Sequence, residues 1–159
     1  MRLFFVNTDA VSFGGQSRHD EWLLRGVVLT GGVAKYRDAL ARVPQGARVL
    51  AYVNGIGVVA AGETTTDEVL DVRPPETVNP SEPVEYHRPV SWLLDLRSSP
   101  ITREELIGLL GQGPLMAVQE VHSGKDRLLR RLALLEAAPT SDIGIYLRVA
   151  AELRRYGAV

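Results

Sequence analysis

The stretch ARVLAYVNGIGVVAAGE, residues 47–63, decides the fold. Two apolar runs, residues 47–53 and 57–62, flank Asn54-Gly55, and both of these residue types tolerate the positive φ angles of a tight turn. The pattern predicts a β-hairpin. Because Gly57 follows so closely, a three- or four-residue loop with a bulge fits as well as a two-residue turn. Runs that are almost wholly apolar are typical of strands buried on both faces, so we expect this hairpin at the centre of a curled sheet.

Composition and charge limit the classes of function. The chain has 159 residues and no cysteine, which excludes disulfides, thiol catalysis and zinc–thiolate sites from it. Its net charge of −1 excludes a global basic field for nucleic acid, although basic residues cluster locally at residues 125–131 and 148–155. The opening apolar run, residues 3–6, is too short for a signal peptide or a membrane span. We therefore expect a cytoplasmic protein without membrane contact.

Candidate strands and candidate helices follow one another along the chain without strict β–α alternation. We expect strands at residues 2–6, 47–53, 57–62, 68–72, 84–96 and 114–118, and a Pro-rich surface loop at 73–83. We expect helices after Asp20, at residues 33–43, 102–110 and 125–138, and from a cap at 140–142 to Tyr156. The sum favours an α+β fold: a small, curled, mostly antiparallel β-barrel with flanking helices and a C-terminal helical pair.

The last helix has apolar residues at helical spacing, Ile145, Val149 and Leu153. This periodicity predicts that these three side chains face the barrel. We place the main domain at residues 1–138, and the last helix, within 139–159, is packed on it or appended to it.

Standard catalytic and metal-binding signatures are absent from the sequence. It contains no Walker A loop, no GxGxxG after a strand, no HExxH and no GxSxG. The histidines, His19, His87 and His122, have no metal-ligand spacing. We expect neither a metal nor another cofactor.

The placement of the aromatic residues is informative. Trp22 follows a Gly- and Ser-rich stretch, Tyr52 lies beside Asn54 in the hairpin, and Tyr86 and Trp92 lie on the strand after the Pro-rich loop. If the sheet curls, these side chains meet at one mouth, where they would stack a flat base. The alternative is that they belong to the core, above all Trp92, whose neighbours are apolar.

The order of these pieces resembles the PUA-like superfamily, and within it the YTH and EVE domains that read modified bases. The resemblance spans roughly residues 2–135. It rests on the N-terminal run FFVNT, the isolated Trp22, the strand pair RVLAYV and GVVAAGE, the strand PVSWLLDL, and PLMAV leading to SGKD.

The resemblance implies a module that flips one modified nucleobase of DNA or RNA into an aromatic cage, with methylated adenine or cytosine as ligand. Trp22 matches the first wall of the cage, and Asn7 and Thr8 lie at the turn that lines the pocket. For the second wall, where the family has a tryptophan, Tyr86 or His87 is the nearest substitute. The run after Trp22 is apolar where the YTH pattern is polar, which leaves the EVE-like reading, including modified cytosine, open.

The same resemblance implies a phosphate contact ahead of the closing helix. Lys125 stands where the family has a phosphate-binding Arg, and Asp126 where its Asp faces the base edge. Arg127, in the same basic run, is assigned to phosphate binding as well. The alternative is that Asp126 stabilises a helix N-terminus and that Lys125 is solvated.

Two other functions stay open. The first is a small amidohydrolase of the ASCH type acting on modified nucleosides, with Lys35, Glu63 and Thr64 in catalytic roles. The second is an interaction protein whose last helix, residues 141–156, docks a partner protein of a restriction or toxin–antitoxin system.

Overall fold

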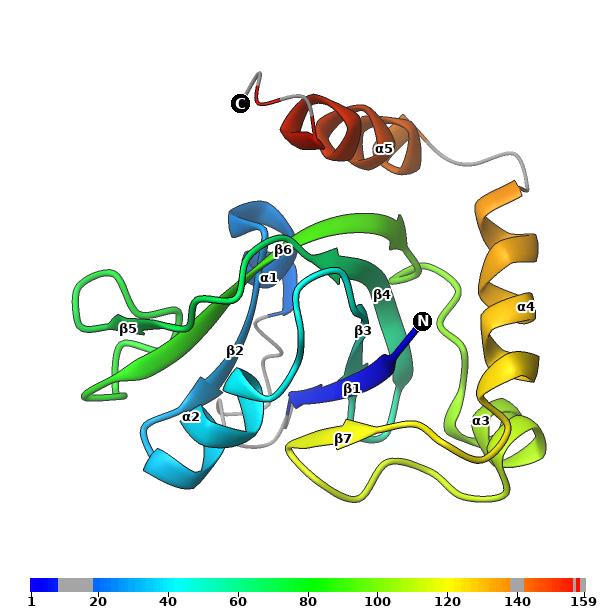
Figure 1. The fold of residues 1–159 in the computed structure, drawn as a ribbon, viewed down its shortest axis with the longest axis horizontal. Helices are drawn as coiled ribbons and strands as arrows, with labels where there is room; N and C mark the ends of the chain where they lie inside the picture. The colour runs from blue at the N-terminus through cyan, green and yellow to red at the C-terminus, as the bar shows by residue number, and fades with distance from the viewer. Residues whose placement is uncertain (9–18, 138–141, 156, 158–159) are drawn as a thin grey trace.

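The computed structural model describes residues 1–8, 19–137, 142–155 and 157 (Figure 1). In chain order its elements are β1 (Leu3–Thr8), α1 (His19–Arg25), β2 (Val27–Gly31), α2 (Ala34–Ala41), β3 (Arg48–Val53), β4 (Gly57–Thr64), β5 (Leu70–Val72), β6 (Glu85–Asp95), α3 (Arg103–Leu110), β7 (Val118–Glu120), α4 (Lys125–Ala137) and α5 (Asp142–Arg155).

The strands form one curled sheet in the order β2-β6-β4-β3-β1-β7, with β5 paired to β6 beside this path. β1 and β3 run parallel and all the other pairs are antiparallel. The long strand β6 joins the two halves, because its first part pairs with β2 and β5 and its second part with β4. In the described residues no strand pairing joins the two end strands, β2 and β7, so the sheet is a half-barrel that is open between them. The predicted α+β class and the curled, mostly antiparallel sheet are confirmed.

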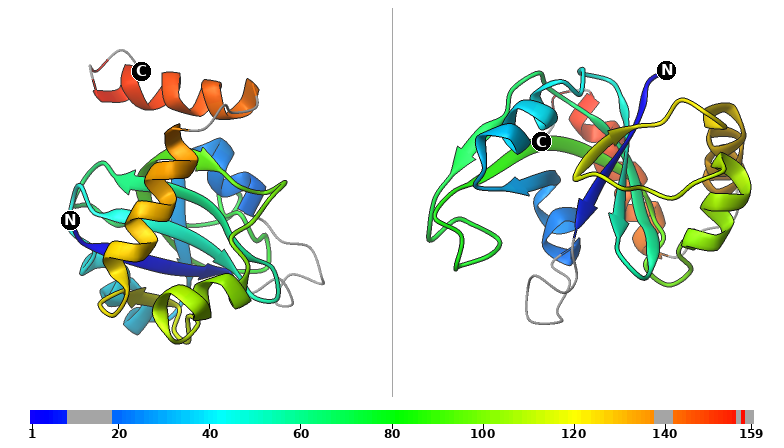
Figure 2. Two further views of the ribbon diagram at one scale, coloured as in Figure 1. Left: turned by 90° about the vertical axis from the view of Figure 1, so that its right-hand side faces the viewer. Right: turned by 90° about the horizontal axis from the view of Figure 1, so that it is seen from below.

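Both faces of the sheet are buried, as the apolar hairpin predicts. Phe4, Val6, Val49 and Ala51 belong to one core, which also holds Trp22 and residues of α1, α2 and α5. The alternate residues Phe5, Leu50 and Tyr52 belong to a second core under α3 and α4. Figure 2 shows the corresponding layers, with α1 and α2 on one side of the strands and α3 and α4 on the other.

The central hairpin has a three-residue connection, residues 54–56, between β3 and β4. A bulge follows, since Ala51 pairs with Ala60 while Tyr52 pairs with Val58, which leaves Val59 as the extra residue. Gly57 has a φ of 130°, and next to it Val58 exchanges two backbone hydrogen bonds with Ile101 at 2.8 and 3.1 Å. The connection before α3 is thereby fixed to the hairpin.

Several local predictions were wrong. Residues 27–31 form β2, which was not expected; the strand expected at residues 114–118 forms instead at Val118–Glu120; and Pro89 lies inside the continuous strand β6. The loop expected at residues 11–18, the helix cap at 140–141 and Tyr156 lie outside the described residues.

Helix α5 packs on the barrel with a different face from the predicted one. Leu147 and Ala151 are buried, whereas Val149 and Leu153 are 51% and 43% exposed. Leu147 joins the core that holds Trp22, so α5 covers part of the sheet. The division of the chain near residue 138 stays a prediction. No helix within the described part of the chain is long and apolar enough to cross a membrane.

The close approach at Gly57 gives a stability test. A Cβ at position 57 would collide with the carbonyl group of Ile101, whereas one at Gly55, whose φ of 80° is also positive, meets nothing within 4 Å. We expect Gly55→Ala to lower the free energy of unfolding by about 1 kcal/mol from backbone strain alone. Gly57→Ala should cost about 2 kcal/mol more, because overpacking adds to the strain. Urea unfolding of the two variants measures the difference, and equal losses would contradict the collision.

Candidate functional site

A cavity of about 280 Å³ opens between the C-terminal ends of β1 and β2, at the open side of the half-barrel. It is lined by Asn7, Thr8, Trp22, Leu29, Thr30, Gly31, Tyr36, Glu82, Glu85 and Ala117. Cavities that hold drug-sized ligands begin at roughly 300 Å³, so this one suits a single small heterocycle. It lies where the curled sheet stays open between its end strands, β2 and β7.

Three of its lining residues carry buried side-chain oxygens without a hydrogen-bond partner among the described residues: Asn7 Oδ1, Thr8 Oγ1 and Thr30 Oγ1. Buried polar atoms in folded proteins are nearly always paired, and each exception calls for an explanation. The Asn7 amide nitrogen donates to Asn54 Oδ1 at 3.2 Å, which fixes the orientation of this side chain. A cluster of unpaired oxygens at one cavity is what a polar ligand would satisfy.

The aromatic residues of the cavity are Trp22 and Tyr36. Trp22 is only 3% exposed, and its backbone carbonyl accepts a hydrogen bond of 2.9 Å from the indole nitrogen of the fully buried Trp92. This bond anchors α1 to β6, so Trp22 forms a fixed wall. Tyr36, on α2, is partly exposed, and the Lys35 ammonium group lies 5.0 Å from its ring centroid.

The cavity also contains a buried carboxylate, Glu85, at the start of β6. It accepts hydrogen bonds from the backbone nitrogens of Val78 and Asn79 at 2.7 and 2.8 Å, and His87 Nε2 lies 2.9 Å away. Burial alone would raise the pKa of Glu85, but the bonds from His87 and the two backbone groups outweigh it and lower the pKa. Glu85 is therefore an ionised acceptor at neutral pH.

The predicted base-binding residues divide in space. Asn7, Thr8 and Trp22 line the same cavity, and Asn54 contacts Asn7 from the exposed hairpin loop. Tyr52 lies instead in the second core, with its ring edge-on to Phe5 at 5.9 Å, so we leave it out of the candidate site.

Tyr86 is buried in the first core and does not line the cavity; the guanidinium carbon of Arg37 lies 5.9 Å from its ring centroid.

The predicted phosphate-binding residues lie elsewhere. Lys125, Asp126 and Arg127 line a second cavity of about 370 Å³, together with His122, Gly124 and Arg130. The segment around β7 runs antiparallel beside β1 along most of its length. Asn7 N bonds to Ala117 O at one end, and Val121 N bonds to Leu3 O at the other. At 3.3 Å per residue, these two ends of β1 are roughly 13 Å apart. Asp126 thus lines a different cavity from Asn7, and the two cavities share no lining residue.

Sequence reasoning missed Thr30, Tyr36, Glu82 and Glu85. The signal for Thr30 was the run VVLTG, which reads as a short strand ahead of Gly31-Gly32. Tyr36 lay inside the predicted helix at residues 33–43, where its spacing suggested a core position.

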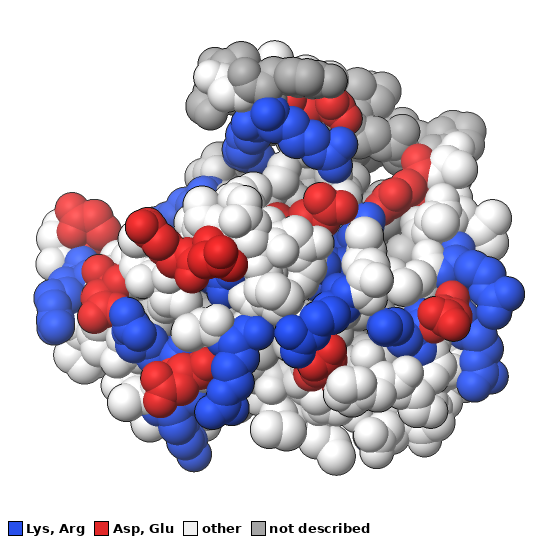
Figure 3. Space-filling model, in the orientation of Figure 1, with Lys and Arg blue, Asp and Glu red and all other residues white. Residues whose placement is uncertain are grey.

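A groove of about 440 Å³ adjoins the cavity and shares Tyr36 and Ala117 with it. Lys35 and Arg42 of the α2 segment line it on one side, and the exposed Leu115 and Met116 on the other. Figure 3 shows Lys and Arg side chains over the α2 region at the lower left of the molecule, mixed with acidic ones. The groove therefore combines two cations and one carboxylate, Asp38, with an apolar edge.

The geometry gives no support to the amidohydrolase. Lys35 lines the groove at α2, whereas Glu63 and Thr64 line a separate cavity beside α5. In the described part of the chain, no group of three or more histidine, aspartate and glutamate side chains is placed to hold a metal ion.

Comparison with solved structures reveals the same architecture. The YTH domain of Zygosaccharomyces rouxii MRB1, solved in complex with N6-methyladenosine RNA, matches 89% of this chain over 90% of its own, with a TM-score of 0.54 and 13% identity. The YTH domain of Toxoplasma CPSF4, without ligand, matches the same shares with a TM-score of 0.53 and 18% identity.

The chain has the fold of YTH domains. The complex of the YTH domain-containing protein mmi1 with RNA agrees, at a TM-score of 0.51 and 11% identity over 98% of this chain and 86% of that one. At these identities the likeness concerns the fold. No family model and no curated protein matches the sequence.

The unpaired hydroxyl of Thr30 gives a matched test against Thr64. Thr64 Oγ1 donates to Pro44 O at 2.6 Å and accepts from Ala47 N at 3.2 Å. We expect Thr64→Val to lower the free energy of unfolding by about 1–2 kcal/mol, whereas Thr30→Val should leave it unchanged or raise it slightly. Thermal unfolding of the unliganded variants checks this, and a comparable loss at both sites would mean that the Thr30 hydroxyl has a partner.

The carboxylate of Glu85 predicts a pH dependence. Because its folded-state pKa is lowered, its contribution to stability is present above its ordinary pKa of 4.5 and is lost as the pH falls through the lower folded value. Glu85→Gln should therefore be less stable than wild type at pH 7, and the gap should narrow progressively below pH 4.5. Urea unfolding at several pH values measures this gap. A constant gap would show that ionisation of Glu85 contributes nothing.

Proposed function

We propose that the chain is a nucleic-acid-binding module that takes one modified base into the cavity between β1 and β2. The observation that carries this proposal is the coincidence of an aromatic wall, Trp22 and Tyr36, with three unpaired side-chain oxygens at one cavity of base size. The fold supports it, since solved neighbours with this fold include YTH domains in complex with RNA. Extruding a base costs a few kcal/mol, which stacking and edge hydrogen bonds offset.

The polar groups of the cavity favour a base with an exocyclic amine. The side chains of Glu82 and Glu85 only accept hydrogen bonds when ionised, and Asn7 Oδ1 is also an acceptor. Adenine and cytosine present an amino group as donor at the position where guanine, thymine and uracil present a carbonyl. A methyl group on such a base would pack against the apolar parts of Trp22 and Leu29. Methylated adenine and methylated cytosine, in DNA or RNA, are the expected ligands.

The neighbouring groove supplies the backbone contacts in this proposal. Lys35 and Arg42 lie on the same side of the molecule as Tyr36, so they would neutralise phosphates next to the flipped nucleotide. The exposed Leu115 and Met116 would contact an adjacent base or sugar. Lys125 and Arg127, at the other end of β1, would contact phosphates further along the strand.

A panel of short single-stranded oligonucleotides, each carrying one modified base, tests the proposal. We expect tighter binding to methylated adenine or cytosine than to the unmodified oligonucleotide in fluorescence anisotropy, with affinity falling as salt rises. Tyr36→Ala should weaken binding about fivefold or more, because stacking contributes roughly 1–3 kcal/mol per base. Trp22→Ala is a poorer test, since removing a buried tryptophan destabilises the fold.

Leu24→Ala is the matched control. Leu24 lies on α1 near Trp22 but is 79% exposed and does not line the cavity, so this variant should bind as wild type does. Equal affinity for modified and unmodified oligonucleotides, or undiminished binding by folded Tyr36→Ala, would overturn the proposal.

A further inference from the structure

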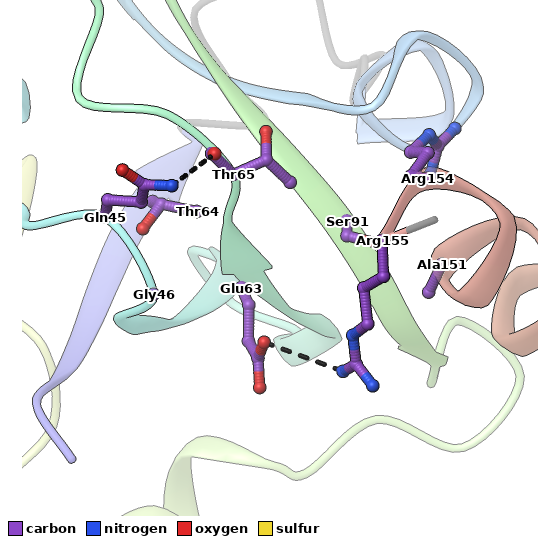
Figure 4. A pocket seen from close by; sticks show the side chains of 9 residues that line it. All are labelled: Gln45, Gly46, Glu63, Thr64, Thr65, Ser91, Ala151, Arg154 and Arg155. Carbon is purple, nitrogen blue, oxygen red and sulfur yellow. Dashed lines mark hydrogen bonds and ion pairs between the residues drawn. The ribbon is translucent and has the colours of Figure 1, made fainter. Parts of the chain in front are cut away.

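A further polar cavity, of about 500 Å³, lies between helix α5 and the barrel. It is lined by Gln45, Gly46, Glu63, Thr64, Thr65, Ser91, Ala151, Arg154 and Arg155 (Figure 4). The buried Leu147 and Ala151 hold α5 against the core, and the C-terminal turn of the helix carries the two arginines. Figure 3 shows Lys and Arg side chains on the face of α5 that turns toward the barrel.

The arginines give this cavity a positive balance. Arg155 forms ion pairs with Glu63 at 3.7 Å and with Glu152 at 3.1 Å, and Figure 4 shows its guanidinium pointing toward Glu63. Glu63 is shared with Arg48 at 3.4 Å, so its charge is already compensated. The guanidinium of Arg154 makes no ion pair with any described residue and lies beside Gly26. The cavity therefore contains one cation that its neighbours do not neutralise.

The floor of the cavity offers a hydroxyl that has no partner. Ser91 is 6% exposed, and its Oγ is fully buried without a hydrogen bond to any residue that the structure describes. The neighbouring Thr64 hydroxyl is bonded to Pro44 and Ala47, so it has no such deficit. A buried hydroxyl donor in a cavity that an exposed, uncompensated guanidinium also lines is suited to an oxyanion, which accepts hydrogen bonds from both groups.

This cavity is distinct from the one proposed for the base. Glu85 lines the base cavity and Ser91 lines the cavity under α5, and both lie on β6. They are six positions apart, which is about 20 Å along the strand at 3.3 Å per residue. The two cavities share no lining residue.

We propose that the cavity under α5 binds a phosphate group, with Arg154 as the principal cation and Ser91 as a hydrogen-bond donor. The volume exceeds that of a bare phosphate, so the group belongs to a larger molecule, either a small phosphorylated metabolite or a nucleic-acid strand. The carboxylate of Glu63 repels the anion and thereby lowers the affinity of the site for phosphate.

Titration of the full chain with inorganic phosphate, followed by NMR chemical shifts, tests this site. Arg154→Gln should weaken phosphate binding about tenfold, because a hydrogen bond to a charged group contributes about 1.5–3 kcal/mol. Ser91→Ala should weaken binding severalfold. Glu63→Gln should strengthen it, since a carboxylate near the anion is removed; a merely structural role for these residues would not give effects of opposite sign.

Arg127→Gln, on α4 and outside this cavity, is the control and should bind phosphate at the α5 site as wild type does. The two sources of phosphate separate by competition between adenosine monophosphate and an unmodified oligonucleotide. If only the oligonucleotide displaces phosphate, the site belongs to a nucleic-acid strand; if the nucleotide does so too, it accepts a small molecule.

Shifts confined to Lys125, Arg127 and Arg130, or a phosphate affinity that Arg154→Gln leaves unchanged, would overturn the assignment. This test is independent of base recognition, because Tyr36→Ala leaves the cavity under α5 intact.

Discussion

The missing pairing between the end strands of the sheet, β2 and β7, is the constraint on which the candidate site depends. Every other neighbouring pair in the sheet is joined by a hydrogen-bonded ladder, so the curl leaves one unclosed side. Backbone groups at the edges of the end strands lose partners that a closed barrel would provide. The unpaired oxygens of Asn7, Thr8 and Thr30 lie beside this gap. The cavity and the residues with unpaired side-chain oxygens thus lie at the same open side of the sheet.

The central hairpin makes that opening possible. Because β3 and β4 are buried on both faces, helices must cover the sheet on both sides, and α1 and α2 are thereby placed at the open edge. The bond from Trp92 Nε1 to the carbonyl of Trp22 then ties α1 to β6. One rigid frame, composed of β6, α1 and the end of β1, positions the walls of the cavity. A preorganised site of this kind loses little conformational entropy when a ligand binds.

Local signals explain what the sequence revealed and what it did not. The hairpin was predictable because Asn54-Gly55 and two long apolar runs are independent of the rest of the chain. β2 was missed because five residues between a short helix and a glycine pair carry too little periodicity. Tyr52 was misplaced because side chains alternate along a strand, and only the position of the bulge and the curl decide which face meets Trp22.

The position of Asp126 shows a different limit. The place of Asp126 in the order of motifs matched the family pattern. Its place in space depends on the antiparallel pairing of β7 with β1, which no local sequence pattern encodes.

Helix α5 has a buried apolar face and a charged last turn. Leu147 and Ala151 supply its buried apolar face, but the apolar residues at the predicted spacing, Val149 and Leu153, remain largely exposed. Arg155, in the last turn of the helix, forms an ion pair with Glu63, which is itself paired with Arg48. Arg48 also pairs with Glu136 of α4, so one charged network connects both C-terminal helices to the hairpin. Because exposed pairs contribute little individually, the network orients α5 more than it stabilises it. That orientation places Arg154 and Arg155 at the cavity that Ser91 also lines, so the polarity of this cavity follows from how the helix is held.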